Sequence, residues 1–289
     1  MPIARRVPNA AWIALIGIAA FMAVGCASGQ APFPARHRMY TIDGPAGQLF
    51  VDDGGRGGVP VLFVHSFGGS TAHWRTQLKH LRQERRAVAM DLRGHGGSDS
   101  PRSGGYAVDA MAQDIAAVAD ALKLKRFVLV GHSMGGAAAA AYAGKYRDRV
   151  AGLVLVGTPG KADPVQAAQV LAGIDSDYDN VVAGYWKSLI AGAQPNARSL
   201  LEADMRRMQR EPSTAMIRSI FANDPLPSLS AYRGPKFIID TPHGDGQAAL
   251  YRQAPQIPRR VITGTSHWPQ LDKPVEFNAL MDEFLYGAR

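Results

Sequence analysis

One serine in this sequence lies in a setting that favours nucleophilic catalysis. Ser133 is the centre of the pentapeptide GHSMG at residues 131–135, between an apolar run and a helix-like run. The chain must therefore turn sharply from strand to helix at the serine, which projects its hydroxyl from the sheet. The small flanking glycines allow strand and helix to approach each other. We expect the N–H of Met134, near the start of the helix, to point at a developing oxyanion.

A serine hydroxyl is a weak nucleophile and needs a neighbouring base. Of the eight histidines, His267 is the best placed, because it follows a strand-like run and comes after Ser133 in the chain. His65 and His95 precede the serine and belong to other motifs. His132 lies inside the turn itself, where packing is its expected role. The sequence therefore predicts His267 as the general base.

The acid that orients the imidazole has two candidates in the hexapeptide DTPHGD, residues 240–245. Asp240 ends a strand-like run, whereas Asp245 precedes a helix-like run, so capping of that helix explains it adequately. We predict that Asp240 fixes the tautomer of His267 and stabilises the imidazolium. Asp245 remains the alternative.

Strand-like and helix-like segments alternate along most of the chain and must position these side chains. Continuous apolar strands between amphipathic helices predict an α/β fold with a doubly wound, mostly parallel sheet. Between residues 160 and 233 only helical patterns occur, which predicts a helical cap inserted into a core of residues 38–159 and 234–289. The strand-like runs lie at residues 39–42, 48–51, 61–64, 87–90, 127–130, 153–156, 236–239 and 260–263.

Two further segments resemble motifs of the α/β-hydrolase superfamily. The hexapeptide HSFGGS at residues 65–70 resembles its His-Gly-x-Gly-Gly loop, with Ser66 in place of the usual glycine, and DLRGHGGS at residues 91–98 resembles its D-x-R-G-H-G-x-S turn. With the GHSMG motif, the chain resembles the capped, serine-dependent esterase and peptidase branch. The resemblance implies that Phe67 offers the second oxyanion N–H and lines the acyl pocket. A positive φ at Ser66 would cost more than at glycine.

The N-terminus predicts export. Arg5 and Arg6 precede an uncharged apolar stretch at residues 10–24, shorter than the roughly 20 residues that span a bilayer as a helix. Residues 1–25 therefore read as a signal peptide. Their end resembles a bacterial lipobox, which implies lipidation of Cys26. We expect a lipoprotein anchored in the periplasm or cell envelope on a tether at residues 26–37, the alternative being ordinary cleavage.

Composition limits the partners. The 289 residues are 46% hydrophobic and 19% charged, as in a globular protein. The formal charge is +8, but the basic residues stand singly or in pairs, so we expect no nucleic-acid partner. The single cysteine excludes a disulfide within the chain. No metal or nucleotide motif occurs, so neither a metal nor a cofactor is expected.

These features predict a carboxylesterase-like enzyme that acts on a small, fairly apolar ester, amide or lactone through an acyl-enzyme. Carbon–carbon bond hydrolysis and cofactor-free perhydrolysis use similar triads and remain open. An exported ligand-binding or signalling protein on a hydrolase scaffold is the alternative from another class.

Overall fold

A computed structural model of the chain describes residues 37–101, 105–244, 246 and 248–287. These described residues all belong to one compact unit. The predicted signal segment, most of the tether, Cys26 and Asp245 lie outside the described residues.

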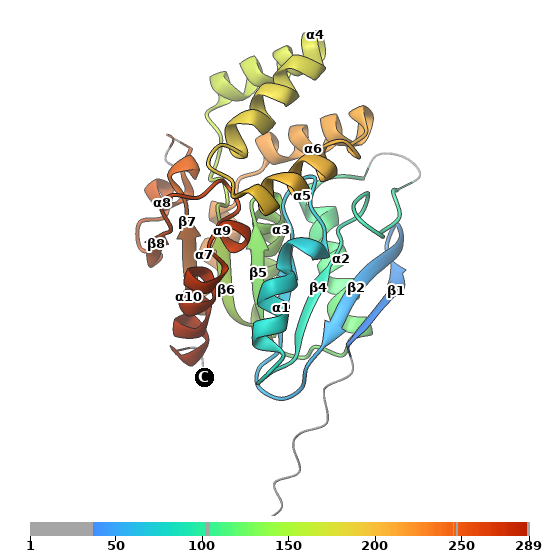
Figure 1. The fold of residues 1–289 in the computed structure, drawn as a ribbon, viewed down its shortest axis with the longest axis vertical. Coiled ribbons are helices and arrows are strands. Elements are labelled where there is room, and N and C mark those ends of the chain that lie inside the picture. The colour runs from blue at the N-terminus through green and yellow to red at the C-terminus, as the bar shows by residue number, and fades with distance from the viewer. Residues whose placement is uncertain (1–36, 102–104, 245, 247, 288–289) are drawn as a thin grey trace, which may run out of the picture. The chain divides into compact units, whose positions relative to one another are not determined.

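The predicted sheet is confirmed. Eight strands lie in the order β1-β2-β4-β3-β5-β6-β7-β8 (Figure 1). Only the pairs β1–β2 and β2–β4 are antiparallel, and every other neighbouring pair is parallel. The strands are β1 (Arg38–Gly44), β2 (Gly47–Gly54), β3 (Val61–Val64), β4 (Ala87–Met90), β5 (Phe127–His132), β6 (Val150–Val156), β7 (Lys236–Asp240) and β8 (Arg259–Val261).

Every residue of the central strands β3, β4, β5 and β6 is buried, because helices cover both faces of the sheet. Alternate residues of β3 belong to two separate cores: Phe63 packs with α1 and α10, and Leu62 with α2 and α3. The helices are α1 (Arg75–Leu81), α2 (Val108–Ala121), α3 (Met134–Lys145), α4 (Pro164–Leu189), α5 (Pro195–Met205), α6 (Arg210–Ala222), α7 (Leu226–Ala231), α8 (Leu250–Gln253), α9 (Pro269–Asp272) and α10 (Pro274–Gly287), with 3-10 turns η1 (Thr71–Trp74), η2 (Arg147–Arg149) and η3 (Pro242–Gly244).

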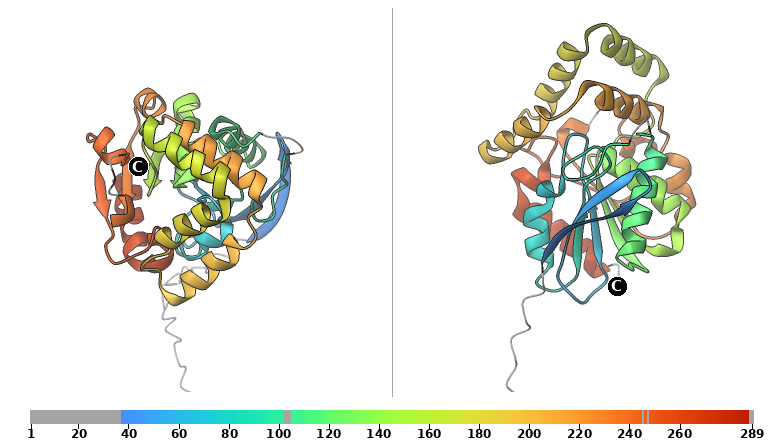
Figure 2. Two further views of the ribbon diagram at one scale, coloured as in Figure 1. Left: turned by 90° about the horizontal axis from the view of Figure 1, so that it is seen from above. Right: turned by 90° about the vertical axis from the view of Figure 1, so that its right-hand side faces the viewer.

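The segment between β6 and β7 contains only helices among the elements of the structure. Helices α4, α5 and α6, here called the cap, lie over the carboxyl end of the sheet (Figures 1 and 2). Helix α4 is folded into two arms at Asp177, whose φ of −150° and ψ of 66° are not helical. Helix α7 packs on the core instead, where Ser228 lies against Gly144 of α3. Within the described residues, no helix has the length and apolar character to cross a membrane.

The turn at residues 91–98 ties loops together and presents no reactive group to the pocket described below. The carboxylate of Asp91 accepts hydrogen bonds from the N–H groups of Thr71 and Gly97. The buried guanidinium of Arg93 donates two hydrogen bonds to Asp114 on α2.

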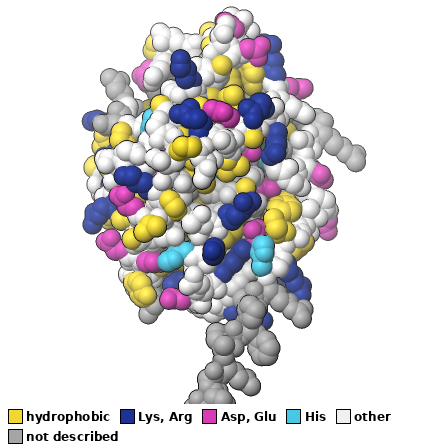
Figure 3. Space-filling view, viewed as in Figure 1, with side chains coloured by type: hydrophobic (Ala, Val, Ile, Leu, Met, Phe, Trp, Pro, Cys, Tyr) yellow, Lys and Arg dark blue, Asp and Glu magenta, His cyan; other side chains and the backbone are white. Residues whose placement is uncertain are grey.

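Charges of both signs are mixed on the molecular surface. On the face in Figure 3, lysine and arginine side chains are interspersed with acidic and uncharged ones. Several arginines are paired with aspartates, as in Arg82–Asp52 and Arg86–Asp53. This face therefore lacks the continuous basic patch that typifies nucleic-acid binding.

Candidate active site

Ser133 occupies a strained turn between β5 and α3. Its φ of 52° and ψ of −115° lie in a region that residues with a side chain rarely adopt. A Cβ at Gly131 would lie 2.4 Å from the carbonyl oxygen of Gly135, and a Cβ at Gly135 would lie 2.3 Å from the carbonyl oxygen of His65. Gly131 and Gly135 must therefore lack a side chain so that β5, α3 and the loop that follows β3 can meet at the serine.

The structure brings Ser133 and His267 to the same pocket, which has a volume of about 430 Å³. The serine is partly exposed there, and the histidine comes from the segment between β8 and α9, residues 262–268, here called the base loop. The pocket is lined by no Asp, Glu, Lys or Arg among the described residues. Its wall toward the cap is apolar and consists largely of side chains of α4 and α6, namely Val170, Ile174, Val181, Val182, Leu189, Ile217, Ile220 and Phe221.

The imidazole of His267 is buried and makes no hydrogen bond to the described part of the chain. Neither Nδ1 nor Nε2 has a partner among the described residues, so no hydrogen bond to Ser133 is formed in this state. Burial, together with the charge of His243, lowers the pKa of His267 to about 4. The ring is therefore neutral at physiological pH and able to accept a proton. The buried ring of His132 packs 4.8 Å from it, and His132 Nε2 donates to the main-chain oxygen of His267.

Among the described residues, no hydrogen bond joins Asp240 to the imidazole of His267. One oxygen of the Asp240 carboxylate accepts a hydrogen bond from the N–H of Thr241, and the other lies 3.2 Å and 3.1 Å from Nε and Nη2 of Arg259. The reason is the strand pairing: β8 runs beside β7 and brings a guanidinium next to the end of β7. In this structure the Asp240 carboxylate thus forms an ion pair with Arg259.

The predicted oxyanion donors, Phe67 and Met134, border the serine. No acceptor among the described residues takes up either N–H, although both residues are buried. The strain expected at Ser66 does not arise, because the positive φ of this loop, 71°, falls on Gly68. The Ser66 hydroxyl instead accepts a hydrogen bond of 3.0 Å from Nε1 of Trp268. The serine that departs from the family pattern thus joins residues 65–70, here called the oxyanion loop, to the base loop.

Two other histidines near the site were not singled out from the sequence. His243, on η3, lines the pocket and its Nε2 lies 3.2 Å from the carbonyl oxygen of Thr265. His73 forms a fully buried contact of 2.8 Å with Asp204 of the cap. Sequence patterns could not have paired residues so far apart in the chain, whereas the placement of His243 directly after a strand was a usable signal.

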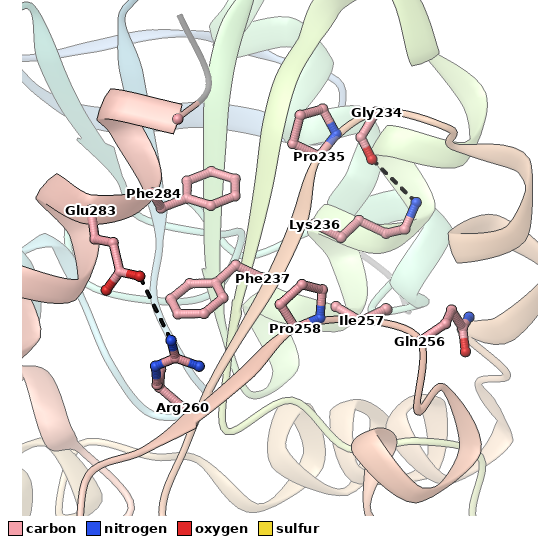
Figure 4. A pocket seen from close by; sticks show the side chains of 11 residues that line it. Gly234, Pro235, Lys236, Phe237, Gln256, Ile257, Pro258, Arg260, Glu283 and Phe284 are labelled. Atoms are coloured by element: carbon pink, nitrogen blue, oxygen red, sulfur yellow. Dashed lines mark hydrogen bonds and ion pairs between the residues drawn. The ribbon is translucent and has the colours of Figure 1, made fainter.

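A larger hollow of about 580 Å³ lies at the opposite end of β7 and β8 (Figure 4). Phe237 and Phe284 stack in its wall with ring centroids 5.8 Å apart, and Arg260 pairs with Glu283. It contains neither the serine nor the base, and it lies at the amino end of parallel strands, away from the usual ligand site of such sheets. The smaller pocket is therefore the candidate active site. Within the described part of the chain, no group of three or more His, Cys, Asp or Glu side chains is placed to hold a metal ion.

A family model described as alpha/beta hydrolase fold matches residues 59–274. Among curated proteins, the dihydrolipoyllysine-residue acetyltransferase component of the acetoin cleaving system of Pseudomonas putida is 27% identical over 89% of this chain and 74% of that protein. The corresponding protein of Cupriavidus necator is 30% identical over 81% of this chain and 65% of its own length. The 2-hydroxy-6-oxo-2,4-heptadienoate hydrolase of Pseudomonas putida is 36% identical over 50% of this chain and 48% of that protein.

Two solved structures show the same arrangement over most of the chain. One is Est816, described as an N-acyl homoserine lactone degrading enzyme, with a TM-score of 0.73 and 25% identity over 85% of this chain and 100% of that one. The other is a thermophilic esterase from Thermogutta terrifontis, with a TM-score of 0.68 and 26% identity over 88% of this chain and 99% of that one.

Proposed function

The chain belongs to the alpha/beta hydrolase fold family, and from that premise we propose that it hydrolyses esters or lactones that carry an uncharged, apolar chain. One observation carries the proposal: a serine on a strained turn and a neutral histidine meet in one largely apolar pocket. Several proteins similar to this chain are named as hydrolases, among them the Thermogutta terrifontis esterase and the 2-hydroxy-6-oxo-2,4-heptadienoate hydrolase.

In the proposed reaction, the Ser133 oxygen attacks the carbonyl carbon while its proton passes to the imidazole of His267. The N–H groups of Phe67 and Met134 hold the negative charge that develops on the carbonyl oxygen. The imidazolium then gives its proton to the departing alkoxide, which leaves an acyl-enzyme. Water, deprotonated by the same imidazole, releases the acid and restores the serine.

The lining of the pocket supports the substrate class. Because no charged side chain faces the pocket among its described lining residues, a carboxylate or ammonium group on the substrate would lose its hydration without gaining a partner. An apolar chain would instead contact the aliphatic side chains of α4 and α6. The names of Est816 and of the Thermogutta terrifontis esterase point to lactone and ester substrates in similar structures.

The chain-length dependence follows from that lining. Each methylene that enters an apolar site gains about 0.8 kcal/mol, which corresponds to a roughly fourfold rise in kcat/KM per carbon. We expect this rise along a series of p-nitrophenyl esters until the pocket is filled, and then a plateau or decline.

Labelling with an alkyl fluorophosphonate tests the nucleophile. Wild-type protein should acquire one label on Ser133 and lose its ester hydrolysis in parallel, whereas Ser133→Ala should neither label nor turn over esters. Folded wild-type protein that does not react with the probe, and hydrolyses no ester of the series, would refute the proposal.

A ligand-binding protein on the same scaffold is the second candidate. It is favoured by the imidazole of His267, to which no carboxylate of the described residues is hydrogen-bonded. Thermal stabilisation by an ester or lactone without its consumption would support binding alone. A burst of one alcohol per protein molecule would support the enzyme.

We also propose that the protein is exported and attached to a membrane through a lipid on Cys26. The support is the sequence of residues 1–26, with its basic start, its apolar stretch and its small residues before the cysteine.

A further inference from the structure

An aromatic side chain of the cap lies between the two loops that bear the proposed catalytic groups. The indole of Trp186, on the second arm of α4, stacks on Trp268 with ring centroids 5.6 Å apart and planes 9° apart. Its centroid lies 6.0 Å from that of Phe67 in the oxyanion loop. All three side chains are buried. Trp186 therefore contacts the residue that offers one oxyanion donor and the residue that follows the proposed base.

The contact with the oxyanion loop is close enough to restrict the main chain. A Cβ at Gly68 would lie 2.6 Å from Cζ2 of Trp186, so the indole edge rests directly against the backbone of that residue. Gly68 also has the positive φ of the loop, 71°. The main chain directly after Phe67 is thus packed against the cap, and the ring of Phe67 contacts the same indole.

The cap is joined to the base loop at a second point. The main-chain N–H of His267 donates a hydrogen bond of 3.0 Å to the carbonyl oxygen of Leu189, the last residue of α4. The Trp268 indole in turn donates to the Ser66 hydroxyl. The cap, the oxyanion loop and the base loop consequently form a closed set of contacts around Trp186.

We infer that Trp186 is a positioning residue: through it, the cap holds the oxyanion donor and the base in the positions that reaction at Ser133 requires. The inference rests on the proposed hydrolase function. Trp186 does not itself line the substrate pocket, unlike its neighbour Tyr185, so its effect should fall on the chemical step and leave substrate affinity unchanged. If Trp186 only packed the cap, its substitution would alter the amount of folded protein and preserve kcat per active site.

Kinetics of Trp186→Leu, normalised to the sites titrated with fluorophosphonate, test the inference. Because misplacement of a catalytic group by about 1 Å costs up to about 100-fold, we expect kcat to fall about 10- to 100-fold while KM changes less than about threefold. Trp186→Phe keeps an aromatic ring against Phe67 and Trp268 and should recover most of kcat.

Tyr178→Leu is the matched control, because Tyr178 is a buried aromatic residue of the same helix that lies outside the pocket lining. It should leave kcat and KM within about threefold of wild type. If Trp186→Leu does not fold, Ser66→Ala tests the same set of contacts. It removes the acceptor of the Trp268 N–H with little change in volume. That variant should lower kcat about three- to tenfold at constant KM.

The two hypotheses fail differently. Wild-type protein that neither labels nor hydrolyses esters refutes the proposed function. Active wild-type protein whose Trp186→Leu variant keeps its kcat, or loses activity through KM alone, refutes the positioning role.

Discussion

Replacing Asp240 by asparagine separates two roles for this carboxylate. As the acid of a catalytic triad it would orient His267, and its loss would reduce kcat about 10⁴-fold. In the structure it pairs with Arg259 and accepts the N–H of Thr241, and the imidazole of His267 has no hydrogen-bond partner among the described residues. We therefore expect Asp240→Asn to lower stability and to leave kcat within about threefold of wild type.

The size of the stability effect follows from the burial of the pair. The Asp240 side chain is 8% exposed and that of Arg259 24%, so the interaction is only partly screened by water. Asparagine keeps an oxygen for the Thr241 N–H but loses the charge opposite the guanidinium. Hydrogen bonds to charged groups contribute about 1.5–3 kcal/mol, which for a domain of this size lowers Tm by roughly 5 °C.

The assay combines thermal unfolding with kcat per titrated active site. Arg259→Gln is the matched control, because it removes the same ion pair from the other side and touches no proposed catalytic group. The double variant should lose less stability than the sum of the two single ones, since both changes break the same ion pair. Asp245→Asn, measured in parallel, tests the alternative acid of the sequence-based prediction.

A loss of kcat of about 10³-fold or more in folded, labelled Asp240→Asn protein, with normal kcat in Arg259→Gln, would refute this reasoning. It would mean that Asp240 leaves Arg259 for His267 in the working enzyme.

Three further predictions follow from the same structure and sequence. Because burial and the charge of His243 lower the pKa of His267 to about 4, the base stays neutral above that pH, and kcat/KM should fall on the acid side with a midpoint near 4. A midpoint near the ordinary histidine value of about 6.5, in protein shown to be folded at each pH, would mean that a carboxylate joins the imidazole. Gly135→Ala places a Cβ 2.3 Å from the carbonyl oxygen of His65, so it should abolish fluorophosphonate labelling and lower Tm by several degrees; unchanged labelling would contradict the tight-turn argument. Cys26→Ala should move the protein from the membrane to the soluble fraction of cells, because the acyl chains supply about 0.8 kcal/mol per buried methylene; an unaltered distribution would contradict lipid attachment.

The local pattern of residue types was sufficient to predict the strands of the sheet and the turn at Ser133. The apolar runs at residues 61–64 and 87–90 coincide with β3 and β4, because strands buried on both faces are apolar throughout. The GHSMG motif predicted the strained turn at Ser133, because only glycine leaves room for the backbone contacts that the turn requires. Both features appear in short runs of consecutive residues, so the order of residue types is enough to reveal them.

The pairing of side chains from distant segments was decided by the tertiary structure alone. The sequence placed Asp240 at the end of a strand but could not show that Arg259 would lie beside it, since strand order and register determine that contact. Nor did any spacing indicate that Trp186 of the cap would stack on Trp268. Such contacts arise where packing brings surfaces together, and their partners have no fixed separation along the chain.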